Sequence, residues 1–173
     1  MEGDQPNGSH HHPPGGLRVA DAGLSPTEQN VLTIARHFMQ SLARPESQGW
    51  IRAFGVAHAV WPKRLAPGLG VAVFAMVQCL RGARVSGFRF SNPDCEHCSA
   101  FLSDDERRLA NMLKATSRGA RSAAHADALM LCEGNDPAML LEAVRGLADL
   151  IQDALRDAEE GLHAEHRAMR PAG

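Results

Sequence analysis

The sequence contains no tyrosine, and aromatic residues make up only 5% of its 173 residues. Strands favour β-branched and aromatic side chains, so this scarcity argues against a fold built mainly on a sheet. Alanine and leucine supply most of the 44% apolar content, and both are good helix formers. The composition therefore predicts an all-α protein, with a chain long enough to bury one sizeable core.

An excess of charge of either sign is also lacking. The formal net charge is −2 with histidine neutral, which gives no overall attraction to nucleic acid or to an anionic membrane. Lysine occurs only at Lys63 and Lys114, and every other basic residue except histidine is arginine. Together with the many alanines and glycines, this bias is typical of a bacterial source with a GC-rich genome.

Targeting signals and phosphate-binding loops are missing as well. The segment 1–6 is acidic and polar, without the apolar region of a signal peptide. The most apolar run, 65–80, is too short for a membrane span and is interrupted by Pro67 and Gln78. The glycines at 68–70 are not followed by the lysine of a phosphate loop. We therefore expect a cytoplasmic protein with no membrane partner.

Helix starts and stops predict an antiparallel bundle of five or six helices. Capping boxes begin at Ser25 and Ser103, and Gly119 and Gly134 are natural helix ends. The run between Pro67 and Gly82 is apolar almost all round, so it should be the central buried helix. Apolar residues recur at helical spacing in the segments 25–44, 50–61, 67–82, 103–118, 121–133 and 137–157.

The second of these segments has an apolar face made of large side chains. Trp50, Phe54, His58 and Trp61 follow one another at helical spacing. We expect this face to pack into the core, with His58 as a buried and hydrogen-bonded histidine.

Polar, glycine-rich and charged sequence marks the ends of the domain. Residues 1–23 are rich in glycine, proline and histidine and predict a disordered tail. The histidines at 10–12 could bind a metal weakly or be an artificial addition. Residues 24–158 form the single helical domain, and 159–173 are a polar C-terminal tail or a frayed helix.

One close pair of cysteines lies where the helical pattern breaks. An extended segment from Val85 leads through the turn 92–94 into Cys95 and Cys98. Two thiolates at this spacing are a common half-site for zinc or for an iron–sulfur cluster. Cys79 and Cys132, near the ends of two predicted helices, could supply two further thiolates. We therefore predict a structural metal site, zinc in preference to an iron–sulfur cluster, in which His97 could replace one thiol.

Other roles for these thiols stay open. Cys95 and Cys98 could be a redox dithiol, although no βαβ pattern surrounds them. Buried free cysteines can also be ordinary apolar side chains. Cys132 and His125 could form a nucleophile pair, but seven helical residues separate them by about 10 Å along the axis.

A basic region in the middle of the chain suggests a third class of function. The helices 103–118 and 121–133, joined at Gly119, could form a helix-turn-helix that binds DNA. Against this, the second helix is rich in alanine and acidic residues occupy 104–106. The basic residues are Arg81, Arg84, Arg89, Arg107, Arg108, Lys114, Arg118 and Arg121.

The leading prediction is a small helical metal-binding module that acts through a protein partner or as a homodimer, rather than as an enzyme. The alternatives are a helical DNA-binding regulator and a thiol redox sensor or cysteine-dependent enzyme.

Overall fold

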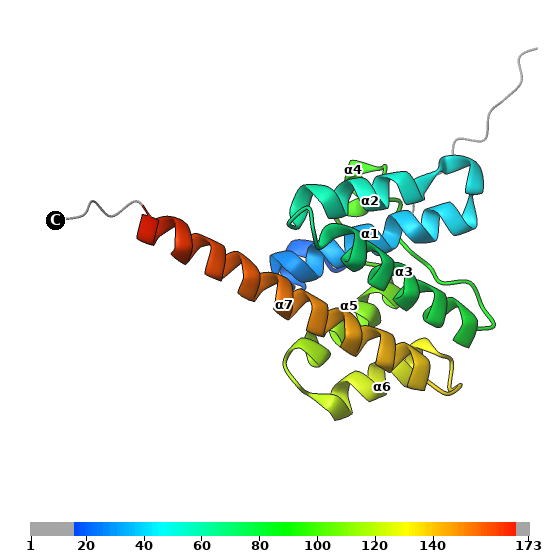
Figure 1. Ribbon diagram of the computed structural model, residues 1–173. Coiled ribbons are helices and arrows are strands. Elements are labelled where there is room, and N and C mark those ends of the chain that lie inside the picture. Colours follow the sequence, from blue (N-terminus) through cyan, green and yellow to red (C-terminus); the bar gives the residue numbers. More distant parts are fainter. Residues whose placement is uncertain (1–15, 169–173) are drawn as a thin grey trace, which may run out of the picture.

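The structure is a computed structural model that describes residues 16–168, with side chains up to residue 156 (Figure 1). Within this range the chain is all-α and contains no strand; one isolated β-bridge joins Arg18 and Phe101. The prediction of an all-α bundle is confirmed. The α-helices are α1 (Pro26–Ala43), α2 (Gly49–Val60), α3 (Ala66–Ala83), α4 (Glu96–Ser99), α5 (Asp104–Ser117), α6 (Arg121–Leu131) and α7 (Ala138–Ala168).

Six of these helices correspond to predicted segments, and the short α4 lies inside the predicted cysteine loop. The main helix pairs are α1 with α2, α5 with α6, and α3 with α7. Helix α3 also packs on α1 and α2, which joins the first pair to the rest of the bundle. Figure 1 shows α7 crossing the bundle and continuing beyond it.

The predicted helix boundaries rest on local chemistry that the structure contains. Ser25 and Glu28 form a complete capping box at α1, with Pro26 in the first helical position. Ser103 and Glu106 form a second box at α5. The main chain turns with a φ of 69° at Gly119, just after α5, a left-handed conformation that glycine adopts without strain.

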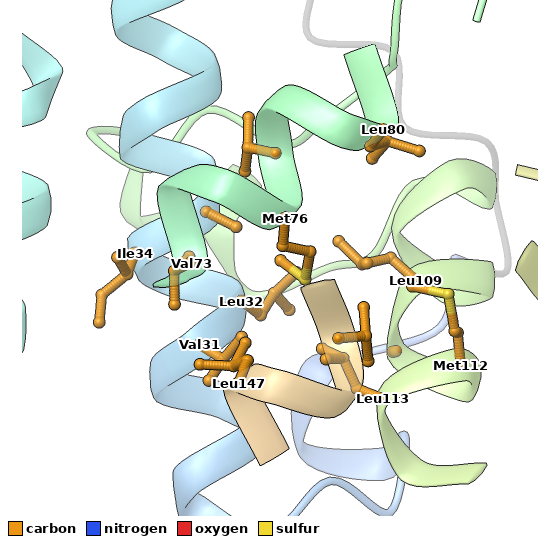
Figure 2. Packing of buried hydrophobic residues seen from close by; sticks show 14 of the residues in the cluster. Val31, Leu32, Ile34, Val73, Met76, Leu80, Leu109, Met112, Leu113 and Leu147 are labelled. Atoms are coloured by element: carbon orange, nitrogen blue, oxygen red, sulfur yellow. The ribbon is translucent and has the colours of Figure 1, made fainter. Parts of the chain in front are cut away.

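The core includes buried apolar side chains from six helices, and its centre joins α1, α3, α5 and α7 (Figure 2). Helix α3 buries only one side, however, since Val71 is 56% exposed. The expectation of a helix buried all round is therefore wrong.

By length and hydropathy, α3 is the one helix in the described part that could cross a membrane. Central core residues are Val31, Leu32 and Ile34 of α1, Val73, Met76 and Leu80 of α3, Leu109, Met112 and Leu113 of α5, and Leu147 of α7.

The predicted apolar face of α2 packs into the core only in part: Phe54 and Trp61 lie against it, whereas Trp50 and His58 do not. The completely buried positions are Gly49, Ala53 and Ala57, whereas Trp50 is 51% exposed and His58 is exposed. Small residues let the backbones of α1 and α2 approach closely near Gly49, where a Cβ would lie 2.4 Å from His37 O. The ring of Phe54 packs edge-on against Phe38 of α1, with ring centroids 5.5 Å apart. The prediction of a core histidine at position 58 is therefore wrong.

The described structure includes parts of the chain on both sides of the predicted helical domain 24–158. Within the predicted tail, Leu17 and Val19 hydrogen-bond to the segment 100–102: Val19 N donates to Ala100 O, and Leu17 O accepts from Leu102 N, both at 2.9 Å. Residues 1–15, including the histidines at 10–12, lie outside the described residues, as do 169–173. Helix α7 continues to Ala168, which agrees with the helical alternative for its end.

Candidate functional site

The cysteine loop is attached to the bundle by a buried arginine on α1. Arg36 donates from Nη1 to Ser99 O at 2.7 Å and from Nη2 to Phe101 O at 2.8 Å. Its Nε donates to Glu106 Oε1 at 2.6 Å. The exposed fraction of the side chain is 4% for Arg36 and 0% for Glu106. A buried ion pair fixes the chain immediately after the cysteine pair.

Glu106 has its remaining hydrogen-bonding capacity filled by the same loop. Ser91 N donates to Oε1 at 3.1 Å, and Ser103 N donates to Oε2 at 2.8 Å. A buried carboxylate needs such partners to offset the loss of water. The sequence identified Glu106 only as a helix cap, whereas it is also the centre of the loop's anchorage.

The turn before Cys95 has a second attachment, to α1 and α2. Asp94 Oδ2 accepts from Gln40 Nε2 at 2.6 Å and from Arg52 Nη2 at 3.1 Å. The turn is closed locally by Asp94 N, which donates to Asn92 Oδ1 at 3.0 Å. The turn predicted at 92–94 is therefore present and is held from two helices.

The two cysteines of this loop lie in direct contact. Cys98 N donates to Cys95 Sγ at 3.3 Å, and the two thiols hydrogen-bond to each other. Cys95 is half-buried, whereas only 5% of Cys98 is exposed. Cys95 is therefore the more exposed residue of the pair.

Hydrogen bonding between the two cysteines shifts their pKa values in opposite directions. The side chain and then the backbone N–H of Cys98 stabilise a thiolate at Cys95 and lower its pKa from the ordinary thiol value. The pKa of Cys98 is raised, first by the hydrogen bond that its thiol makes with Cys95 and then by burial. A single negative charge in the pair therefore belongs on Cys95.

The other two cysteines belong to the apolar core. All four cysteines are free thiols. Cys132 is completely buried at the end of α6, where burial raises its pKa, and Cys79 packs against the core from α3. This environment disfavours a Cys132 thiolate and a nucleophilic role with His125.

Among the described residues, no three histidine, cysteine, aspartate or glutamate side chains come together as metal ligands. The structure brings Cys95 and Cys98 together but does not add Cys79 and Cys132 to them, because both pack with the core. A structural zinc site needs four ligands, and the pair supplies two. Zinc and an iron–sulfur cluster at this pair stay predictions that would need ligands from elsewhere.

A second polar cluster holds the beginning of the loop. Glu133 accepts hydrogen bonds from Val85 N at 2.8 Å, from Ser86 N at 3.2 Å and from the Ser86 hydroxyl. These bonds, the Ser86 hydroxyl first, lower the pKa of Glu133 to about 2. Arg84 pairs with Glu133 and with Asp105 at 3.4 Å each.

These contacts also engage part of the basic region considered for DNA binding. Arg84 and Arg89 both pair with Asp105, and Arg107 pairs with Asp104. The DNA-binding alternative gains no support from this arrangement and stays a prediction.

Two hollows in the described surface lie away from the cysteine pair. One, of about 230 Å³, is lined mainly by apolar residues of α1, α3 and the segment 86–90, together with Arg81 and Arg84. The other, of about 560 Å³, lies between the start of α6 and the middle of α7, and Arg121, His125 and Arg145 line it. Neither contains Cys95 or Cys98, so a reaction partner would meet the pair outside these hollows.

Comparison with protein-family models, curated proteins and solved structures found no match for this chain.

Proposed function

We propose that this protein is a cytoplasmic thiol–disulfide exchange module in which Cys95 is the attacking sulfur and Cys98 the resolving one. One observation carries the proposal: the sulfur of the half-buried Cys95 accepts a hydrogen bond from the amide of the buried Cys98, and the Cys98 thiol also stabilises the Cys95 thiolate. The nucleophile in thiol chemistry is the thiolate, and these bonds favour it at the accessible position.

The reaction would be a two-step exchange with a disulfide on another molecule. The Cys95 thiolate attacks one sulfur of that disulfide, which forms a mixed disulfide and releases the first partner thiolate. Cys98 then gives its proton to solvent and attacks the Cys95 sulfur, which releases the second partner thiolate. Two electrons pass from the cysteine pair to the partner, and an intramolecular Cys95–Cys98 disulfide remains.

The anchorage of the loop supports this chemistry. Arg36 holds the carbonyls of Ser99 and Phe101, and Gln40 and Arg52 hold Asp94, so the pair is fixed on both sides. Fixing two reacting groups in contact makes the resolving step intramolecular and lowers its entropic cost. The partner class that fits an accessible sulfur outside the hollows is a protein disulfide, on another protein or on a second copy of this chain.

The test combines thiol counting with metal analysis of the purified full chain. We expect oxidised glutathione to convert four free thiols into two, with the new disulfide mapped to Cys95–Cys98 by mass spectrometry. Cys98→Ser should accumulate glutathione on Cys95, and Cys95→Ser should react much more slowly. Cys79→Ser is the matched control and should behave as the wild type.

Two results would contradict the proposal. One is stoichiometric zinc that protects Cys95 and Cys98 from oxidation, which would favour the metal prediction for the same residues. The other is a pair that stays reduced while glutathione adds to Cys79.

A further inference from the structure

The larger of the two hollows lies where α6 and α7 meet. Helix α6 packs closely on α5 but only lightly on α7. Two of the residues that α6 buries, Ala124 and Ala128, have small side chains that fill little space. A hollow of about 560 Å³ remains between the start of α6 and the middle of α7. Pockets that bind small molecules typically have volumes of about 300–1,000 Å³, so this one has the size of a small-ligand site.

Two arginines from different helices line this hollow. Arg121 is the first residue of α6 and Arg145 belongs to α7, and both are exposed. Among the described residues, neither has an ion-pair or side-chain hydrogen-bond partner, whereas Arg36 and Arg84 are both paired with carboxylates. Two guanidinium groups beside one space are therefore available to an anion. The planar fork of arginine matches the oxygens of a phosphate group.

Further hydrogen-bond donors lie on the α6 wall of the hollow. Ser122 and His125 line it, and a hydroxyl group and an imidazole can each donate a hydrogen bond. The residue before α6 is Ala120, which has no side-chain group to cap the helix, so the first amides of α6 add to the positive character here. These amides supplement the two arginines, and the whole wall favours a negatively charged group.

The α7 wall of the hollow also contains a hydrogen-bond acceptor. Arg145, Asp149 and Gln152 follow one another at helical spacing along one face of α7, and all three line the hollow. The Asp149 carboxylate accepts hydrogen bonds from hydroxyl groups, and the Gln152 amide can donate or accept. A bare anion would leave both groups unused and would be repelled by Asp149. A ligand with a phosphate at one end and hydroxyl groups along its body uses both kinds of group.

The apolar part of the lining is aliphatic and small. It consists of Ala124, Leu141 and Ala148, and no phenylalanine or tryptophan is among the described residues that line the hollow. Proteins commonly bind nucleobases by stacking them on aromatic side chains. The lining therefore favours a hydroxylated body over a nucleobase.

We propose that this hollow binds a small sugar phosphate or polyol phosphate, with Arg121 and Arg145 holding the phosphate and Asp149 accepting hydrogen bonds from the hydroxyl groups. Neither Cys95 nor Cys98 lines the hollow, so the site is independent of the proposed exchange chemistry.

The test is isothermal titration calorimetry of the full chain with glucose 6-phosphate, glucose and inorganic phosphate as probes. We expect one molecule of glucose 6-phosphate to bind per chain, inorganic phosphate to bind more weakly and glucose not to bind. Arg121→Gln and Arg145→Gln should each weaken the binding of glucose 6-phosphate by about tenfold, because each removes a charge-assisted hydrogen bond. Asp149→Ala should reduce the preference for glucose 6-phosphate over inorganic phosphate.

Arg44→Gln is the matched control. It removes one positive charge from an exposed position outside the hollow, and it should leave the affinity unchanged. Because Arg121 and Arg145 are exposed and unpaired, their variants should keep the helical circular dichroism spectrum of the wild type.

Three results would overturn the proposal. The first is that glucose 6-phosphate does not bind, or binds no more tightly than inorganic phosphate. The second is that Arg44→Gln weakens its binding as much as Arg145→Gln does, which would show attraction to the general charge of the protein. The third is that adenosine monophosphate binds more tightly than glucose 6-phosphate, which would contradict the ligand class.

Discussion

Arg36 Nε lies 2.6 Å from Glu106 Oε1, although 70 positions of sequence separate the two residues. The contact joins α1 to α5. The same two side chains also hydrogen-bond to the cysteine loop, Arg36 to the carbonyls of Ser99 and Phe101 and Glu106 to the amide of Ser91. Because both side chains are buried, the charge of each is stabilised mainly by the opposite charge of the other. The stability of the fold and the geometry of the site thus depend on the same pair.

Removing one member of this pair should be far more harmful than removing both. We expect Arg36→Met or Glu106→Leu alone to lower the free energy of unfolding by about 3–5 kcal/mol, because an uncompensated charge stays buried. The double variant should lose less than either single one. Urea unfolding of the four proteins measures this, and strictly additive losses would contradict the account.

The close contact between α1 and α2 predicts opposite effects for two glycines of one helix. A Cβ at Gly49 would lie 2.4 Å from His37 O, whereas nothing lies within 4 Å of one at Gly55. Gly49→Ala should cost about 1–3 kcal/mol through overpacking. Gly55→Ala should stabilise by about 0.5–1 kcal/mol, since alanine is the better helix former. Thermal unfolding checks both, and equal shifts in Tm would be inconsistent with the helix contact.

Glu133 should contribute to the acid sensitivity of the protein. Its pKa is about 2 in the folded state, against an ordinary value of about 4.3 in the unfolded chain. A lowered folded pKa gives stability that is complete above about pH 4.5 and is lost as the pH falls through about 2. Glu133→Gln lacks this titration, so its unfolding free energy should approach that of the wild type as the pH falls. A difference that stays constant from pH 6 to pH 2 would refute the assignment.

Much of the helical framework follows from the sequence because its determinants are local. The capping boxes at Ser25 and Ser103, and the glycine after α5, act within a few residues of each other, so spacing alone reveals them. The packing face of α2 could not be predicted in this way. The choice of Gly49 over Trp50 depends on how closely α1 approaches, which is a property of the assembled bundle.

The site was predictable to the same limited extent. Cys95 and Cys98 and the turn before them are visible as a break in the helical pattern. Arg36, His37 and Gln40 interrupt an inward-facing apolar stripe, which was the available signal for a polar attachment. Their partners, Glu106 and Asp94, lie more than 50 positions away, and only the fold brings them together.

The four thiols should react with iodoacetamide in an order set by their surroundings. Cys95 should be modified first at neutral pH, because it is half-buried rather than fully buried and its pKa is lowered. Cys132 should be modified last, since it is completely buried and its pKa is raised. Peptide mass spectrometry over time gives the order. Equal rates at Cys95 and Cys132 in the folded protein would show that the site is not as described.

The most direct test of the central claim is the redox equilibrium of the Cys95–Cys98 pair in glutathione buffers of graded potential. We predict one two-electron transition with a midpoint between about −180 and −270 mV, a range typical of cellular dithiol exchange proteins, unchanged in Cys79→Ser and absent in Cys95→Ser. A pair that forms no disulfide at any potential, or a transition that survives in Cys95→Ser, would contradict it.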